Sequence, residues 1–326
     1  MTVDRRKFLK TVALAGVAST LPGLAKFDWA AGRTWKEAAQ AESRDAAPGS
    51  FDFVFFTDTH IEPELDAAHG CDMCFRKIAS LRPEFAINGG DHVYDLLGTN
   101  ARRATSIFDL YDRTQQLLEM PLYHAIGNHD VFGIYAHSGV SPSDPGYGKK
   151  MYEDRLGRRT YYSFDRKGYH FIVLDSIQPT GDRFWQSRID DEQLQWLEND
   201  LRDTGAVRPI IVVVHVPMVT GYATFAPKTT EQHKYNTYTV DNALDVLPLL
   251  ERHNVLAVLQ GHTHVNELVR FKNIDFITSG AVSGNWWHGP RMGFAEGFTV
   301  VSLRNGMLST RYETYGFHSV DVRERF

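Results

Sequence analysis

The sequence predicts an α/β fold, a sandwich core of mixed β-sheets with helices outside, and three observations lead to this prediction. Short runs of β-branched and aromatic residues alternate with amphipathic runs of helical period along most of the chain. From residue 268 onward the pattern becomes rich in strands. The chain has 326 residues, 43% of them hydrophobic, so it can bury a sizeable core.

The first half of the pattern alternates strictly between strands and helices. The run FDFVFFT is strongly strand-forming because it is aromatic and β-branched, and residues 102–120 place Ile107, Leu110 and Leu117 on one helical face. In order, we expect a strand at 51–57, a helix at 71–81, a strand at 85–89, a helix at 102–120 and a strand at 122–126.

The second half begins with a hairpin and ends in strands. The turn Arg166-Lys167-Gly168 separates two strand-like runs, and PIIVVV and VLAVL are apolar throughout, as buried strands are. We expect strands at 161–165 and 170–175, a helix at 191–201, a strand at 209–214, a helix at 240–253, and strands at 255–259, 268–271, 274–278, 298–303 and 308–312. Segments 133–160 and 217–238 are long and irregular, which is typical of binding loops and also of plain surface insertions.

The N-terminus has the features of an export signal. Residues 4–10 (DRRKFLK) carry two adjacent arginines, and the weakly hydrophobic segment 11–25 that follows leads into small residues near 25–31. This resembles the bacterial twin-arginine signal, although Asp4 departs from its first position. The apolar segment is shorter than the ~20 residues that span a bilayer, so we expect no membrane span in the mature protein.

The resemblance implies a bacterial protein that the twin-arginine machinery exports, already folded, to the periplasm or the outside of the cell. We therefore divide the chain into a signal peptide at 1–31, a linker at 32–50 and one domain at 51–326. A frayed basic helix or a single membrane anchor would be the alternatives for the signal segment. The net charge of −5 provides no basic field for a nucleic-acid partner.

Polar side chains follow five of the expected strands at the point where each strand ends. In chain order these are Asp58 and His60, Asp91, Asn128 with His129 and Asp130, His215, and His262 with His264. The carboxyl ends of strands are where α/β folds bind ligands. Any one of these residues alone is weak support for a site, because a lone histidine after a strand is usually a cap; their shared placement is what indicates one.

The residue types indicate metal ions. Imidazole, carboxylate and amide groups without thiolate suit Mn, Fe or Zn. They outnumber the three or four ligands of one tetrahedral site, so two ions about 3.5–4 Å apart that share a carboxylate fit better. The alternate spacing in Asp58-x-His60 and in His262-x-His264 puts both side chains on one side of an extended segment.

Together these motifs resemble those of the calcineurin-like metallophosphoesterases. They span residues 58–264 and read DTH, GGD, GNHD, the lone His215 and GHTH. The resemblance implies a four-layer α/β/β/α sandwich and two metal ions. Asp58, His60, Asp91 and His264 would hold the first ion; Asp91 would bridge to the second, which Asn128, His215 and His262 would complete.

The resemblance also implies a nucleophile and a proton donor. A hydroxide between the ions would attack the phosphorus, and His129, off the metals, would assist the leaving group as a general acid or as an electrostatic clamp. Asp130 would orient His129 or cap the next turn. Trp286, Trp287, Arg291 and Tyr94 are candidate substrate contacts, although the two tryptophans would suit the core equally.

The function expected is that of an exported dinuclear-metal phosphoesterase for small phosphomonoesters or phosphodiesters. One alternative is an acid phosphatase like the purple acid phosphatases, with Tyr94 as an iron ligand; those enzymes, however, have glycine where this chain has His60. Others are a cyclic-nucleotide phosphodiesterase, a dimetal hydrolase of another ester and a non-catalytic binding protein. The complete set of ligand types argues against the last.

Overall fold

The computed structural model describes residues 47–157, 159–225 and 234–323. The expected signal peptide and most of the expected linker lie outside these residues.

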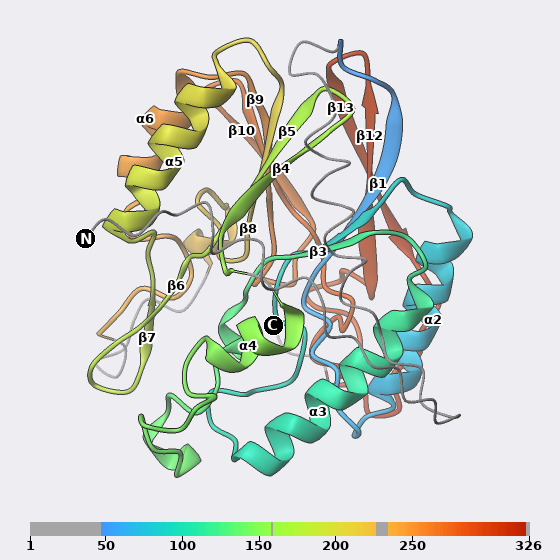
Figure 1. The fold of residues 1–326 in the computed structure, drawn as a ribbon. Coiled ribbons are helices and arrows are strands. Elements are labelled where there is room, and N and C mark those ends of the chain that lie inside the picture. The colour runs from blue at the N-terminus through green and yellow to red at the C-terminus, as the bar shows by residue number, and fades with distance from the viewer. Residues whose placement is uncertain (1–46, 158, 226–233, 324–326) are drawn as a thin grey trace, which may run out of the picture. The chain divides into compact units, whose positions relative to one another are not determined.

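One sheet contains the first three strands and the last two strands of the described chain (Figure 1). Its order is β13 (Met307–Thr314), β12 (Gly297–Arg304), β1 (Phe51–Phe56), β2 (Ala86–Asn88) and β3 (Leu122–His124). Strands β1, β2 and β3 are parallel, and β12 is antiparallel to β1 and β13. The sheet is therefore mixed, and its parallel strands all end at the same edge.

The second sheet is also mixed. Its order is β10 (Glu267–Phe271), β11 (Ile274–Thr278), β9 (Val255–Gln260), β8 (Ile210–Val214), β5 (Tyr169–Leu174) and β4 (Tyr162–Arg166). Its four central strands are parallel, and the two edge strands are antiparallel to their neighbours. A separate ribbon pairs β6 (Ile177–Pro179) with β7 (Trp185–Ser187).

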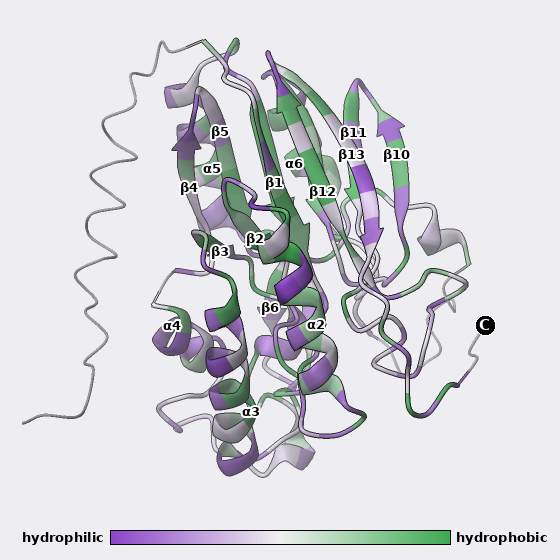
Figure 2. Ribbon diagram, turned by 90° about the vertical axis from the view of Figure 1, so that its right-hand side faces the viewer, coloured by the Kyte–Doolittle hydropathy of each residue, from purple (hydrophilic) through white to green (hydrophobic). Residues whose placement is uncertain are grey.

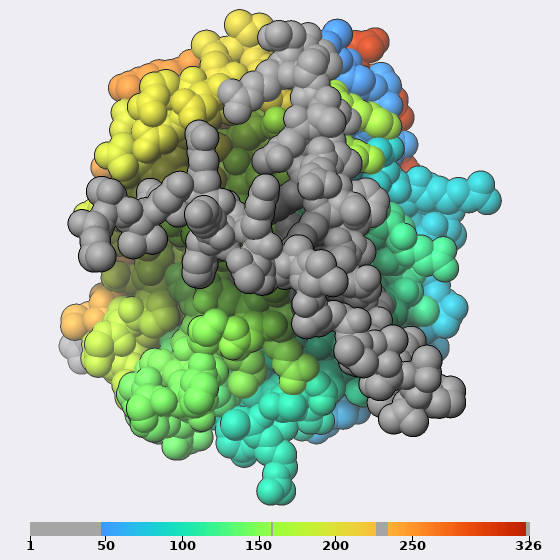
Figure 3. All heavy atoms as spheres, in the orientation of Figure 1, coloured from blue at the N-terminus to red at the C-terminus, as the bar shows by residue number. Residues whose placement is uncertain are grey.

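Helices cover the outer faces of both sheets (Figure 1). Helices α2 (Ala67–Ser80) and α3 (Ala101–Thr114) cover the first sheet, and α5 (Asp191–Thr204) and α6 (Ala243–Glu251) cover the second. The short helix α4 (Lys150–Leu156) packs its buried Tyr152 in a separate apolar cluster. Side chains cap two of the helices, because Asn100 accepts from the amide of Arg103 before α3 and Asp190 from that of Gln193 before α5. In Figure 3, atoms of α5 (yellow) and α3 (teal) lie on the surface.

Three apolar layers hold the sandwich together. Phe53 and Phe55 of β1 pack between the sheets, whereas Val54 and Phe56 of the same strand face α2 and α3, as the period of a strand requires. A third cluster lies between the second sheet and the helices α5 and α6. Figure 2 shows the apolar central strands that supply these layers. The predicted fold class, a four-layer α/β/β/α sandwich, is confirmed.

Several element boundaries differ from the predictions. Helix α2 begins at Ala67 instead of residue 71 and so includes Gly70, where Trp287 occupies the space that a Cβ atom would need. The helix predicted at 102–120 ends at Thr114 and continues only as the 3₁₀ turn Gln115–Leu117. Helix α4, which lies within the segment predicted to be irregular, has too few residues to show a helical period. Among the described residues, no helix is both long and apolar enough to cross a membrane.

Candidate metal centre

The polar loops that follow the five predicted strands lie together. Three of them extend from the carboxyl ends of β1, β2 and β3, and two from those of β8 and β9 in the other sheet. Their donor atoms form three overlapping groups in which all atoms lie within 4.8 Å of one another. The groups are Asp58 with His60 and His264, Asp91 with His215 and His262, and His60 with Asp91 and His129.

Asp58, His60 and His264 form the first group. The Nε2 atom of His264 lies 3.2 Å from Asp58 Oδ1 and 3.1 Å from His60 Nε2. Donor atoms that share one cation at about 2.0–2.2 Å are separated by about 3 Å, so these distances suit a common ion. The three side chains are almost fully buried, and water would compete little for such an ion.

Asp91 lies between the first group and the second. Its Oδ2 atom is 3.6 Å from His60 Nε2 and 3.1 Å from His215 Nε2. Its Oδ1 atom accepts a hydrogen bond from the amide of His129 at 2.8 Å. Oδ2 is therefore turned toward both groups, which is the position that a bridging carboxylate would need.

Buried polar atoms without partners support metal binding. Within the described part of the chain, Asn128 Oδ1 and His215 Nε2 are buried and make no hydrogen bond. Such atoms are rare in folded proteins because each loses its interactions with water. An ion would supply the missing partner, and the donor set of imidazole, carboxylate and amide fits Mn, Fe or Zn.

Backbone carbonyls orient two of the imidazoles. The Nδ1 atom of His215 is 2.9 Å from the Gly89 oxygen, and that of His264 is 2.5 Å from the Gly284 oxygen. In each ring Nδ1 donates the proton to the carbonyl, which leaves the lone pair of Nε2 directed toward the other ligand atoms.

The backbone is left-handed at five of the seven predicted ligands. The φ angle is 56° at Asp58, 38° at His60, 53° at Asp91, 71° at His262 and 60° at His264. Residues other than glycine adopt this region rarely, and such strain persists only where surrounding contacts enforce it. Hydrogen bonds between the loops provide those contacts, for example from the Asp58 amide to the Gly90 oxygen at 2.9 Å and from the His60 amide to the Asp91 oxygen at 3.0 Å.

Glycines allow the loops to approach one another closely. A Cβ atom on Gly127 would lie 2.2 Å from Asp91 Oδ1, and one on Gly261 would lie 2.3 Å from Thr57 Oγ1. A Cβ atom on Gly90 would lie 2.5 Å from His215 Nδ1, and Gly90 also has a φ of 111°. These glycines therefore allow close packing around the ligands.

The charges at the centre are those of a cation site. Burial alone would raise the pKa of Asp58, but the His264, His60 and His215 rings hold it well below its ordinary value. Burial lowers the pKa of His60 to about 4, so this ring is neutral and able to bind a metal. Burial opposes the charged form of His215 as well, yet the neighbouring carboxylates of Asp91 and Asp58 raise its pKa to about 9.

His129 and Asp130 occupy different environments. His129 is partly exposed, and its ring lies edge-on to the His60 ring with 4.7 Å between centroids. Asp130 is fully buried. Its carboxylate accepts hydrogen bonds from the amides of Gly127, Asp91 and His92 and bonds to the His92 ring. These contacts position the loops that carry Asp91 and Asn128, so the cap expected from the sequence describes Asp130 better than a catalytic contact does.

The candidate substrate residues occupy different environments, and only some of them are exposed near the centre. Trp286 is partly exposed, with its ring 4.4 Å from that of His264, and the guanidinium of Arg291 lies 5.5 Å from the Trp286 centroid. Trp287 is fully buried in the core beside α2 and donates from Nε1 to the His60 oxygen at 3.0 Å. It supports the loop of His60 and has no surface for a substrate. The Tyr94 ring lies 6.3 Å from that of His129.

A pocket of about 220 Å³ adjoins the centre. It is lined by Glu62, Leu65, Tyr94, Asn285, Trp286, His288 and Arg323. Sequence reasoning identified only Tyr94 and Trp286 of these. Glu62 could have been predicted as a third residue of the pocket from one local signal, its position two residues after His60.

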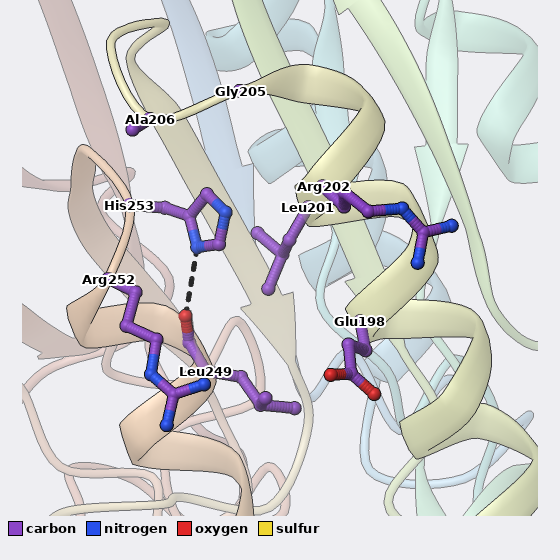
Figure 4. A pocket seen from close by; sticks show the side chains of 8 residues that line it. All are labelled: Glu198, Leu201, Arg202, Gly205, Ala206, Leu249, Arg252 and His253. Carbon is purple, nitrogen blue, oxygen red and sulfur yellow. Dashed lines mark hydrogen bonds between the residues drawn. The ribbon is translucent and has the colours of Figure 1, made fainter.

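A larger hollow of about 320 Å³ lies between α5 and α6 (Figure 4). Its lining includes Gly205 and Ala206 before β8 and His253 before β9, so it lies at the opposite ends of these strands from the metal ligands. It is therefore separate from the centre.

Comparison with known proteins decides the family. The model of the calcineurin-like phosphoesterase family matches residues 51–266, well over half of the chain. The chain belongs to the calcineurin-like phosphoesterase family. The matched span contains every predicted metal ligand, from Asp58 to His264.

Two curated relatives of this chain are phosphatases by name. The bovine serine/threonine-protein phosphatase CPPED1 is 26% identical over 80% of this chain and 75% of its own length. The Arabidopsis thaliana purple acid phosphatase 21 is 29% identical over 51% of this chain and 36% of its own length. Among solved structures, a dimetal phosphatase from Danio rerio covers 83% of this chain and 100% of its own, with a TM-score of 0.54 and 15% identity, and shares the fold. We conclude that this member of the calcineurin-like phosphoesterase family is a metal-dependent phosphoric ester hydrolase.

Proposed function

We propose that the protein is an exported, dinuclear-metal phosphoesterase that hydrolyses small phosphomonoesters or phosphodiesters. The observation that carries the proposal is the position of Asp91, whose Oδ2 atom faces both His60 and His215 at 3.6 and 3.1 Å. Two cations bound there, of Mn, Fe or Zn, would activate water and offset the negative charge of the phosphoryl group.

His129 is proposed to act at the leaving group. In hydrolysis, water adds to the phosphorus and the bond between phosphorus and the leaving oxygen breaks. His129 gives its proton to that oxygen, and it regains a proton from the attacking water. The bond from its amide to Asp91 Oδ1 ties its backbone to the proposed bridging carboxylate, and its partly exposed ring can reach a substrate.

The likeness to purple acid phosphatase 21 favours a specific second candidate, in which Tyr94 binds iron. Tyr94 stands three residues after Asp91 and its ring lies near His129. An iron–tyrosinate bond would give the iron-loaded protein a visible charge-transfer band that Tyr94→Phe would abolish. A colourless iron-loaded enzyme with phosphatase activity would exclude this alternative.

Metal reconstitution tests the main proposal. Protein freed of metal by a chelator and reloaded with Mn, Fe or Zn would be assayed on 4-nitrophenyl phosphate and on bis-4-nitrophenyl phosphate. We expect activity to vanish with the metals and to return at two equivalents per chain, and the more active substrate would separate a monoesterase from a diesterase. Activity that survives complete chelation would contradict the proposal.

A substitution at His129 tests the proton transfer. We expect His129→Asn to lower kcat about 10²–10⁴-fold on phenyl phosphate, and to lower it less on 4-nitrophenyl phosphate, whose leaving group needs no proton. His69→Asn, on the exposed side of α2, is the matched control. Equal losses on both substrates would mean that His129 acts as an electrostatic clamp and donates no proton.

A further inference from the structure

The pocket beside the metal centre shares two of its walls with the centre. Trp286 lies 4.4 Å from the ring of His264, and Tyr94 lies 6.3 Å from the ring of His129. Because His129 is proposed to stand at the leaving group, the pocket next to it offers a space that can receive that group. The inference below therefore rests on the proposed function.

The walls of the pocket are flat and held firmly. Trp286 and Tyr94 present aromatic rings, and Leu65 adds an apolar surface. The neighbour of Trp286 in the chain, Trp287, is buried and bonded to the His60 oxygen, so Trp286 projects from a fixed segment. Arg291 lies over the Trp286 ring without lining the pocket. Surfaces of this kind bind planar rings by stacking, at little cost in side-chain entropy.

Glu62 gives the pocket a buried acceptor. Its side chain is only 7% exposed, and Arg103 approaches it no closer than 3.5 Å. Arg103 instead bonds both oxygens of Glu64, at 2.9 and 2.7 Å. The Glu62 side chain is thus held in the wall of the pocket by a long contact with Arg103 and by its neighbour Glu64, and a donor on a bound ligand would add to its hydrogen bonding.

The basic groups of the pocket are already paired. Arg323 bonds the carboxylate of Asp321 at 2.6 Å, and His288 lies 3.3 Å from the same carboxylate. They therefore offer little to a second negative charge on the ligand. With Glu62 the lining favours a neutral or cationic group over an anionic one.

We propose that the pocket formed by Glu62, Tyr94 and Trp286 binds the leaving group of the phosphoester, and that this group is a planar ring that bears an N–H or O–H donor and no additional negative charge. The ring stacks between the two aromatic side chains and its donor bonds the Glu62 carboxylate. Glu62 thereby determines specificity without touching the reacting atoms.

Matched aryl phosphates test this assignment. The leaving groups of 4-aminophenyl and 4-methylphenyl phosphate have similar shape and similar basicity, so they differ mainly in the donor. We expect kcat/KM of the metal-loaded enzyme to be about tenfold higher for the amino compound, which corresponds to one hydrogen bond to a charged acceptor of about 1.4 kcal/mol. The 4-carboxyphenyl compound should be the poorest substrate of the three.

Variants of Glu62 provide the decisive comparison. Glu62→Leu should abolish the preference for the amino compound, so that the ratio of its kcat/KM to that of the methyl compound falls to about one. Glu62→Gln, which keeps the shape and an acceptor, should retain part of that preference and raise kcat/KM for the carboxyl compound relative to the methyl compound about tenfold. Glu198→Leu, in the hollow between α5 and α6 shown in Figure 4, is the control and should leave all three ratios unchanged.

The outcomes that contradict the two proposals are distinct. If the enzyme turns over aryl phosphates without favouring the amino compound, or if the preference persists in both Glu62 variants, the assignment of the pocket is wrong and the proposed function stands. If the metal-loaded enzyme hydrolyses none of the three aryl phosphates nor the nitrophenyl esters, the proposed function itself fails.

Discussion

Asp130 connects two loops of the centre through one buried carboxylate. It accepts hydrogen bonds from the amides of Gly127, Asp91 and His92 at 2.9, 3.0 and 2.8 Å, and it lies 2.9 Å from the His92 ring. The His92 ring is in turn 2.9 Å from that of His124. Asp91 and Asn128 depend on the loops held in this way, so Asp130 would influence bound metals through the positions of their proposed ligands.

Asp130→Asn should therefore weaken metal binding. An amide offers one acceptor oxygen where the carboxylate offers two, so part of the four-bond arrangement is lost. We expect the metal dissociation constants to rise about 10–100-fold, as measured by titration calorimetry. Asp144→Asn is the control, because Asp144 also accepts from a nearby amide, that of Gly146, but outside the centre. Unchanged metal affinity together with reduced kcat would instead indicate a direct catalytic role for Asp130.

At the scale of elements, His170 joins a hairpin to a helix. It lies on β5, and its Nδ1 atom is 2.7 Å from Asp165 on the paired strand β4. Its Nε2 atom is 2.8 Å from Asp200 on α5. Burial works against its charge, but the two carboxylates raise its pKa above the ordinary value of 6.5. The protonated ring therefore stabilises the contact between the second sheet and its helix layer.

This arrangement makes stability depend on pH with a definite sign. A pKa raised in the folded state contributes stability that is complete below the unfolded value of 6.5 and is lost as the pH rises through the folded value. We expect His170→Asn to lower the free energy of unfolding by about 1–3 kcal/mol at pH 6, and by less at pH 9, in denaturant titrations. His69→Asn serves as the exposed control. A difference that does not vary with pH would show that the loss is one of packing.

The elements themselves were predictable to different degrees. The buried strands β8 and β9 follow directly from their unbroken apolar runs, and α5 from its polar and apolar faces. The short helix α4 and the ribbon of β6 and β7 could not be predicted from the sequence. Elements of this length depend on contacts with the rest of the chain more than on their own propensity.

At the scale of the whole molecule, the candidate metal centre forms only in the folded chain. Its proposed ligands run from Asp58 to His264 and come from loops of both sheets. Binding would therefore stabilise the folded state, since the unfolded chain has no such site. The twin-arginine signal expected at residues 4–10 fits this requirement, because that route exports folded proteins and would let the metals bind first.

Export can be tested at that signal. We expect Arg5→Lys combined with Arg6→Lys to leave the precursor in the cytoplasm, because the machinery recognises the arginine pair. Lys7→Arg combined with Lys10→Arg is the control and should be exported, and cell fractionation would measure both. Normal export of the double lysine variant would exclude the twin-arginine route while leaving the enzymatic activity unaffected.

The sequence by itself determined the α/β class and the donor types that meet at the candidate metal centre. Both follow from local signals: apolar runs mark the strands, and the residues directly after them, such as Asp58, Asp91 and His215, carry the donor types of a metal site. The loops that follow parallel strands share one edge of a sheet, so the meeting of the loops within each sheet could be expected without coordinates, whereas the meeting of the two edges could not.

Only the tertiary structure decided what neighbouring residues do. Trp286 and Trp287 are adjacent in the chain, yet one lines a pocket and the other fills the core against Gly70. Glu62 lies in that pocket with His288 and Arg323, which are more than 200 residues further along the chain. Such roles depend on contacts between segments far apart in sequence, and local patterns of hydrophobicity carry no information about which face of a loop those distant segments will cover.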